Sequence, residues 1–179
     1  MLLTHCFCEH IEKFELATKV HVVMHRREES KPTATAPLAL QSLANSELYI
    51  HGNQENILDF SDLKTNARRT ILLYPADDAV ILSKEMLLED PRPVDLIVPD
   101  GNWRQAARMG RRLKGLEHAV TAKLPEGPKT EWGIRNEPKE EGLATYEAIA
   151  RAMGILESPK IQDSMESLFR LMVRTTKSM

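Results

Sequence analysis

Short apolar runs of strand length alternate with segments of helical periodicity along most of the chain. Five runs predict strands, at residues 20–24, 47–50, 71–74, 94–98 and 119–124. Apolar residues recur with the spacing of a helix in four other segments, at residues 35–44, 102–114, 145–156 and 162–174. Residues 132–135 fit either a short strand or a turn. Strands that alternate with helices are typical of an α/β domain with a mostly parallel sheet and flanking helices.

The composition favours one cytoplasmic domain. With 179 residues, 42% of them hydrophobic, the chain can bury one sizeable core, so we expect a single domain over residues 1–179. No apolar run has the length of a membrane span, and the first residues lack the basic start of a signal peptide. Cys6 and Cys8 are separated by one residue and cannot cross-link a fold of this size, which favours a reducing compartment. The net charge is -2, so nucleic-acid binding would need a local basic patch.

The sequence Pro-Asp-Gly-Asn-Trp at residues 99–103 directly follows one of the apolar runs. We expect the strand to end before this segment, the chain to turn at Asp100 and Gly101, and a helix to begin at Asn102. Ligands of open parallel sheets bind at the carboxyl ends of strands, so an acid on this turn is well placed for chemistry. The alternative interpretation is a capped turn, in which Asn102 is the N-cap and Gln105 completes a capping box.

Three segments share one pattern, in which an apolar strand is followed by a small or turn-forming residue and then by a polar residue or helix start. They are residues 73–76, 98–101 and 135–147. If their strands are neighbours, the three loops meet at one edge of the sheet and form a pocket. Gly101 and Gly142 would let the backbone of two of these loops approach a ligand closely.

These residues resemble the blocks of the DTW-domain family. Asp-Gly-Asn-Trp-Arg-Gln-Ala at residues 100–106 is similar to the family signature, usually written Asp-Gly-Thr-Trp followed by an alanine. Residues 72–75, 134–135 and 142–148 resemble further blocks in the same order, and the segment from His25 to Thr35 is similar to the family's upstream histidine-acid-asparagine-threonine segment. The resemblance covers roughly residues 6–156.

The resemblance implies a fold related to the knotted SPOUT methyltransferases, with S-adenosylmethionine as co-substrate and no metal. In this family the 3-amino-3-carboxypropyl group is transferred to N3 of a uridine in tRNA, and methylthioadenosine is released. The alternatives are a SPOUT-like RNA methyltransferase and an inactive protein that binds adenosylmethionine or RNA. Residues 1–15, with Cys6 and Cys8, would be the remnant of a four-cysteine element that many relatives carry, and residues 157–179 would form a C-terminal helix.

The chain departs from the family pattern at three positions. Asn102 replaces the threonine of the signature, and it still caps a helix. Ala144 stands where a serine or threonine is usual, which removes a cap hydroxyl opposite Glu147, with Thr145 as the alternative cap. Ala34 replaces the usual asparagine before Thr35, so a polar contact is lost there.

The implied chemistry gives roles to individual residues. Asp100 either accepts the N3 proton of uridine or pairs with the ammonium of the transferred arm. Arg135 either binds the carboxylate of that arm or forms a surface salt bridge. Trp103 either stacks on a base or anchors its helix in the core. The residues expected to line the adenosylmethionine site are Leu73, Tyr74, Pro75, Pro99, Gly101, Asn102, Gly142, Leu143, Ala144 and Thr145.

Four arginines form one stripe along the predicted helix after the signature. They are Arg104, Arg108, Arg111 and Arg112. A basic stripe beside the predicted pocket suits contacts to RNA phosphates, and tRNA is the partner that the resemblance implies. The alternative is an ordinary solvated helix face. The arginine pairs at 26–27 and 68–69 are further candidates for RNA contacts, whereas His21, on a predicted strand, is expected to be structural.

Overall fold

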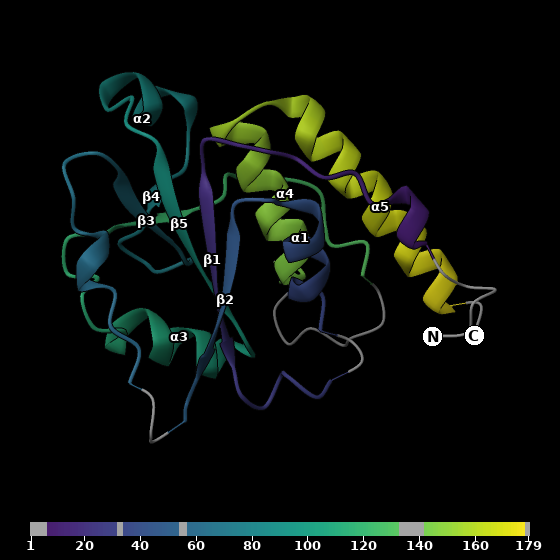
Figure 1. Ribbon diagram of the computed structural model, residues 1–179, viewed down its shortest axis with the longest axis horizontal. Coiled ribbons are helices and arrows are strands. Elements are labelled where there is room, and N and C mark those ends of the chain that lie inside the picture. Colours follow the sequence, from purple (N-terminus) through teal and green to yellow (C-terminus); the bar gives the residue numbers. More distant parts are fainter. Residues whose placement is uncertain (1–6, 32–33, 54–56, 133–141, 178–179) are drawn as a thin grey trace.

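A six-stranded parallel sheet forms the centre of the computed structural model, which describes residues 7–31, 34–53, 57–132 and 142–177 (Figure 1). Its strands are β1 (Lys19–His25), β2 (Ser46–His51), β3 (Arg69–Leu73), β4 (Val80–Ile81), β5 (Val94–Asp100) and β6 (Val120–Lys123). Their order across the sheet is β2-β1-β5-β3-β6-β4, and each neighbouring pair is parallel. The expected α/β fold with a mostly parallel sheet is confirmed.

Helices cover both faces of this sheet (Figure 1). On one face lie α1 (Ala36–Ser42), α4 (Thr145–Leu156) and α5 (Pro159–Lys177), and α3 (Trp103–Arg112) lies on the other. The described chain also contains the short helix α2 (Lys84–Glu89) and the 3₁₀ turns η2 (Cys8–His10) and η3 (Ser61–Leu63). None of the helices in the described ranges is long and apolar enough to span a bilayer.

The central strand β5 is buried on both faces, as expected for a parallel strand between helix layers. Leu96 and Val98 belong to the larger hydrophobic core, under α1, α4 and α5. Ile97 points the other way and packs with Met109 of α3 in a smaller core. Asp100 continues the series of Leu96 and Val98, so its side chain leaves the sheet on the face that α4 covers.

Strand β5 continues two residues beyond the end that the sequence predicts. A proline usually ends a strand because it has no N–H to donate, which placed the expected end before Pro99. In the structure Pro99 pairs with Val23 and Asp100 pairs with Met24, so the neighbouring strand β1 holds the chain extended. Asp100 therefore lies on the sheet itself, and the turn begins one residue later.

Other differences arise where elements are short. The strand β4 has two residues and the helix α2 has six, too few to produce a periodic pattern, and neither was predicted. The helix α5 begins at Pro159 rather than at residue 162, because proline is tolerated in a first helical turn. Trp132 lies outside any strand, and residues 133–135 of that predicted element are outside the described ranges.

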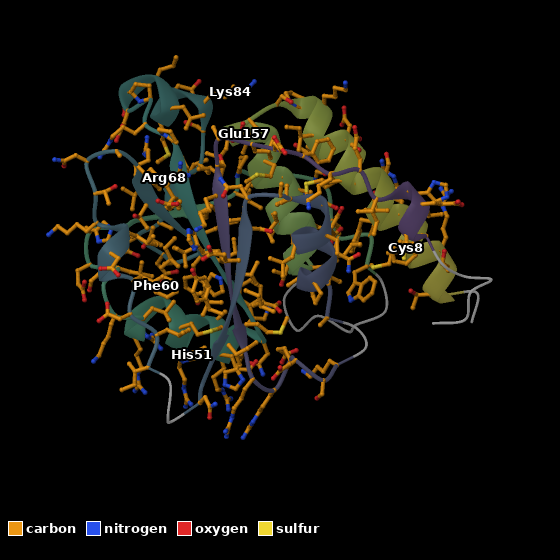
Figure 2. The ribbon with its side chains drawn as sticks, in the orientation of Figure 1. Cys8, His51, Phe60, Arg68, Lys84 and Glu157 are labelled. Carbon is orange, nitrogen blue, oxygen red and sulfur yellow. The ribbon has the colours of Figure 1, made fainter. Side chains whose placement is uncertain are left out.

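An ionic cluster around the buried Asp95 ties the amino-terminal ends of the central strands together, and Figure 2 labels its member Arg68. Arg68 donates from Nε to Asp95 Oδ1 at 3.0 Å, and from Nη2 to the carbonyl oxygen of Val94 at 2.7 Å. His21 Nε2 lies 3.3 Å from the same carboxylate oxygen, which confirms the structural role expected for this histidine. Arg69 donates to backbone carbonyl oxygens of the α2 region. The fold therefore uses both arginines of the 68–69 pair, which the sequence left as further candidates for RNA contacts, in contacts of its own.

Candidate functional site

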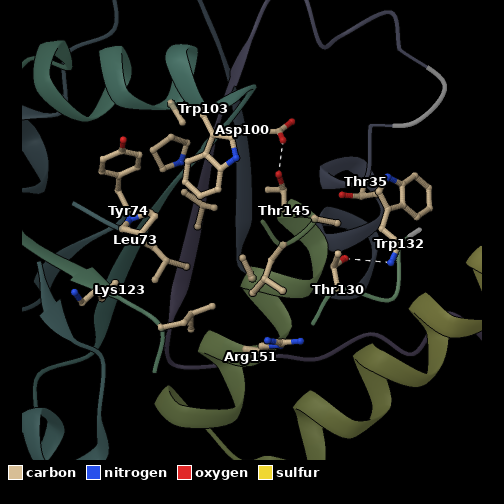
Figure 3. Close-up of a pocket in the computed structure, with 18 of the residues that line it drawn as sticks. Thr35, Leu73, Tyr74, Asp100, Trp103, Lys123, Thr130, Trp132, Thr145 and Arg151 are labelled. Carbon is tan, nitrogen blue, oxygen red and sulfur yellow. Dashed lines mark hydrogen bonds between the residues drawn. The ribbon is translucent and has the colours of Figure 1, made fainter. Parts of the chain in front are cut away.

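A cleft of about 1210 Å³ opens at the carboxyl ends of the central strands (Figure 3). The structure brings all three predicted loops into its lining. The expected residues found there are Leu73, Tyr74, Pro75, Pro99, Asp100, Gly101, Asn102, Trp103, Leu143, Ala144 and Thr145. Gly142 is buried but is not part of the lining, and Arg135 lies outside the described residues. Nearly all of the predicted positions thus share one cavity.

Asp100 joins the central strand to the first turn of α4. Its side chain is 8% exposed, and Thr145 donates its hydroxyl hydrogen to Asp100 Oδ1 (Figure 3). The suggestion that Thr145 serves as a replacement helix cap is therefore wrong, because its hydroxyl is bound to the acid of the signature. Ala144 occupies the N-cap position and has no side-chain acceptor. The departure from the family pattern at Ala144 costs one cap bond and leaves the contact between Thr145 and Asp100 in place.

Glu147 fixes one wall of the cleft. This carboxylate is buried and accepts hydrogen bonds from the backbone N–H groups of Ala144, at 3.0 Å, and Glu131, at 2.8 Å. The hydroxyl of Thr130 donates to it as well. Trp132, which follows Glu131 in the chain, packs against Phe169 of α5 with ring centroids 5.6 Å apart. An acid in the first turn of α4 thereby holds a distant loop against the helix layer.

The alternative interpretation of the signature turn, a capped turn, is confirmed. Asn102 Oδ1 accepts from the Gln105 N–H at 3.0 Å, and Gln105 Oε1 accepts from the Asn102 N–H at 2.7 Å, which is a complete capping box. A Cβ atom on Gly101 would lie 2.9 Å from Gln105 Oε1. Glycine at this position therefore leaves room for the cap. The turn is capped, and Asp100, the last residue of the preceding strand, lines the cleft.

Trp103 lines the cleft instead of anchoring α3. It is half-buried, belongs to neither hydrophobic core, and lies between Tyr74 and Asp100 in Figure 3. Ala106 and Met109 are the buried residues that anchor the helix. The interpretation of Trp103 as a core residue is therefore wrong, and its indole is placed where a flat ligand could stack on it.

The cleft also contains residues that sequence reasoning did not assign to the site. They are Glu28, Lys31, Thr35, Lys123, Lys129, Thr130, Trp132 and Arg151, together with the loop between Lys123 and Lys129. The hydroxyl of Thr35 accepts a hydrogen bond from the Tyr146 N–H at 3.2 Å, which joins the upstream segment to α4. Arg151 was detectable in principle, because residues three apart are neighbours on a helix surface, which connects Thr145 to Ala148 and Ala148 to Arg151.

Charge is unevenly distributed along the cleft. Lys123 and Arg151 lie at the opposite end of Figure 3 from Asp100 and Trp103. Further charged residues of the lining are Glu28, Lys31, Glu126 and Lys129. The cavity therefore has Asp100 beside an aromatic ring at one end and the cations Lys123 and Arg151 at the other.

The arginine stripe lies on the surface next to this cleft. Arg104, Arg108, Arg111 and Arg112 are all exposed on α3, the helix that begins directly after the signature turn. Their exposure fits both alternatives that the sequence left open, phosphate contacts and a solvated helix face.

Two histidines lie at the carboxyl ends of β1 and β2, and Figure 2 labels one of them, His51. His25 and His51 are paired between β1 and β2, with ring centroids 6.3 Å apart. Burial, and then the neighbouring charges of His51 and Arg27, lower the pKa of His25 below its usual value. Burial also lowers the pKa of His51. Both imidazoles therefore favour the neutral form near pH 7, and the exposed arginines at 26–27 supply the charge.

Within the described ranges, no group of three or more His, Cys, Asp or Glu side chains is arranged to hold a metal ion. Cys8 is exposed at the start of η2, and Cys6 lies outside those ranges.

Comparison with known proteins places the whole chain in one family. The family model described as the DTW domain matches residues 1–177. The tRNA-uridine aminocarboxypropyltransferase 2 of Macaca fascicularis is 28% identical over 158 residues, which are 85% of this chain and 53% of that protein. The protein of the same name from Drosophila melanogaster is 26% identical over 155 residues, 84% of this chain and 61% of that protein. The chain therefore spans only about half to three-fifths of these relatives.

The fold also has a counterpart among solved structures. The SAM-dependent rRNA:acp-transferase Tsr3 from Vulcanisaeta distributa superposes with a TM-score of 0.54 at 16% sequence identity. The match covers 87% of this chain and 73% of that protein. At this identity the likeness establishes a shared fold.

Proposed function

This chain belongs to the DTW-domain family, and we propose that it transfers the 3-amino-3-carboxypropyl group of S-adenosylmethionine to N3 of a uridine in tRNA. The observation that carries the proposal is the single cleft in which the signature acid, Asp100, meets Thr145 and Trp103. The names of the curated relatives and of the solved structure with this fold support the same reaction class.

The size of the cleft fits a reaction between two bound partners. Pockets for one small ligand usually enclose about 300–1,000 Å³. The cleft here has about 1210 Å³ and lies at the carboxyl ends of a parallel sheet, where such folds bind their ligands. A co-substrate and a target nucleobase can share this space, which a transfer between them requires.

The proposed step is a displacement at the arm carbon that is bonded to sulfur. The carbon–sulfur bond breaks, its electron pair stays on sulfur, and neutral methylthioadenosine leaves. A new bond forms between that carbon and uridine N3, which loses its proton. The sulfonium is already a good leaving group, so the protein contributes mainly by aligning the arm with N3.

Asp100 is the residue we place at the reacting centre. Uridine N3 carries a proton at neutral pH, so a carboxylate within reach would accept it or stabilise its departure. The second hypothesis is that Asp100 pairs with the ammonium of the arm. The hydroxyl of Thr145 orients the carboxylate in either role.

The loops supply the binding surface for adenosylmethionine. We assign its adenosine part to the loop after β3 and to residues 99–102 and 143–145, all of which line the cleft. Trp103 would stack on a base, either the adenine or the target uracil. We assign the exposed arginines of α3 to the phosphates of tRNA, because they lie on the helix that leaves the cleft.

Product analysis tests this proposal. The purified chain is incubated with adenosylmethionine and unmodified tRNA, and the digested nucleosides and the nucleoside by-product are identified by mass spectrometry. We expect aminocarboxypropyluridine together with methylthioadenosine. Release of S-adenosylhomocysteine with a methylated nucleoside would show a methyltransferase instead. Binding of tRNA and adenosylmethionine without any product, in a folded protein, would show an inactive binding protein.

A further inference from the structure

Arg151 has hydrogen-bonding capacity that the described fold does not use. A guanidinium carries five N–H donors. The side chain is only 14% exposed, yet its buried Nε makes no hydrogen bond to any described residue. Its ion-pair partner, Glu166, lies 3.9 Å from Nε, which is longer than a hydrogen bond. A largely buried cation of this kind is costly unless an acceptor completes it.

The guanidinium is held against the cleft. Arg151 lies six residues after Thr145 on α4, about 9 Å along the helix axis, and both residues line the cavity. On its other side, a Cβ atom at Gly127 would lie 3.3 Å from Arg151 Nη1, so the loop after β6 packs directly on the guanidinium. Lys123 is a further cation in the lining.

The carboxylate of Glu166 is shared between two arginines, so its charge does not serve Arg151 alone. Arg170 Nη1 lies 3.7 Å from the other oxygen of Glu166 and 3.3 Å from Glu131. Arg170 is 37% exposed and is not part of the cleft lining. Two guanidinium groups thus share the carboxylate of Glu166, and the one in the cleft has donors left for a ligand.

A carboxylate is the ligand that this arrangement fits best. The planar guanidinium matches the two oxygens of a carboxylate, and a charge-assisted pair of this kind is strong. The enclosed position suits a small co-substrate, whereas the phosphates of a folded RNA are better met by exposed arginines such as those of α3. The separation from Thr145, which holds Asp100, also places Arg151 away from the proposed reacting centre.

We infer that Arg151 binds the carboxylate of the aminocarboxypropyl arm of adenosylmethionine, the role that the sequence pattern offered to Arg135. This inference rests on the proposed function. Methylthioadenosine lacks the arm and its carboxylate. Arg151 therefore contributes to the affinity for the co-substrate and not to the affinity for the by-product.

Titration calorimetry with both nucleosides tests the inference on the full chain. In Arg151→Gln the dissociation constant for adenosylmethionine should rise at least about tenfold, the effect of losing a charge-assisted bond. The dissociation constant for methylthioadenosine should stay within about twofold, since its binding does not involve the guanidinium. Arg151→Lys keeps the charge and loses the planar set of N–H donors. The rise in the dissociation constant for adenosylmethionine should therefore be smaller than in Arg151→Gln and equally selective.

Three variants serve as controls. Arg170→Gln removes the guanidinium that shares Glu166 outside the cleft, and both affinities should remain unchanged. Glu166→Gln removes the competing carboxylate, so adenosylmethionine should bind as tightly as before or more tightly. Arg135→Gln should show no selective loss of adenosylmethionine binding.

Several outcomes would overturn the inference. They are an equal loss for both nucleosides in Arg151→Gln, the same loss in Glu166→Gln, and a selective loss in Arg135→Gln alone. If Arg151→Gln does not fold, the selectivity of Arg151→Lys decides. Wild-type protein that binds neither nucleoside would contradict the proposed function itself, which separates the two failures.

Discussion

Two aspartates on strand β5 have opposite surroundings although they are only five positions apart. Asp95 is 3% exposed and lies near the amino end of the strand, where Arg68 and His21 hydrogen bond to one of its oxygens. Asp100 is 8% exposed and lies at the carboxyl end, where it accepts a bond from the neutral hydroxyl of Thr145 and lines the cleft. An aspartate thus stabilises the fold at one end of β5, and a second aspartate faces a ligand cavity at the other end.

The partners of Asp95 change its acidity. Burial alone would raise the pKa of this carboxyl, but hydrogen bonds from His21 and Arg68, together with their charges, lower its pKa overall. A pKa that is lower in the folded than in the unfolded state contributes stability above the unfolded pKa, near 3.8, and this stability is lost as the pH falls further. Asp95 is therefore a stabilising acid at neutral pH.

The largest expected effect belongs to Asp100→Asn. This change keeps the size of the side chain and removes its charge, so transfer to uridine should fall by at least about 100-fold. The free energy of unfolding should change by less than about 1 kcal/mol, since the amide can still accept from Thr145. Single-turnover rates and urea unfolding measure the two quantities. A variant that transfers at the parent rate would show that this acid is structural.

Adenosylmethionine affinity in the same variant separates the two roles of Asp100. Loss of an ammonium partner should weaken binding, whereas loss of a base should leave binding intact and slow only the chemical step. In the second case, raising the pH toward the ionisation of uridine N3 should partly restore the rate.

The opposite pattern is expected for Asp95→Asn. Asparagine keeps one acceptor oxygen but loses the negative charge beside Arg68 and His21, so the free energy of unfolding should fall by about 1–3 kcal/mol. Transfer at a temperature where the variant is folded should be unchanged. The difference in stability from the wild type should shrink below about pH 4, because protonation removes the same charge there. Equal stability at neutral pH would contradict the stabilising role.

Thr145→Val tests whether the hydroxyl of Thr145 positions the carboxylate of Asp100. Valine has a similar shape and cannot donate to the carboxylate, so transfer should fall by about tenfold, less than in Asp100→Asn. Thr130→Val is a matched control, because it removes a hydroxyl that donates to Glu147 instead of Asp100. Glu147 holds one wall of the cleft and is not at the proposed reacting centre. Thr130→Val should therefore lower stability more than the rate of transfer. Rate constants and melting temperatures of both variants decide the matter. An unchanged rate in Thr145→Val would remove the positioning role.

The smallest effect per residue is expected on the surface. Replacing Arg104 and Arg108 together with alanine should weaken tRNA binding and reduce the slope of its salt dependence by about 0.7–0.9 for each lost phosphate contact. Adenosylmethionine affinity should stay the same. Lys160 and Arg174, both exposed on α5, provide a control pair with the same change in charge. Equal salt slopes in the two double variants would identify the stripe as a solvated helix face.

Local chemistry made much of the fold predictable. The apolar run before Pro99 indicated the central strand, and side-chain periodicity indicated α3, α4 and α5. Asn102 and Gln105 are three residues apart, so their capping box could be predicted from the sequence. These features depend on residues within one or two turns of each other. For that reason the sequence by itself determined them.

The tertiary structure decided which charged residues the fold uses and which face a ligand. Arg68 and Arg69 look like a basic surface pair in the sequence, but the packing of β3 directs them to buried carbonyl oxygens and to Asp95. Thr145 binds Asp100 across 45 positions of sequence, and Arg151 reaches the same cleft from six residues further along α4. A local pattern does not specify such pairings, because they depend on the order of the strands and on which helix covers each face.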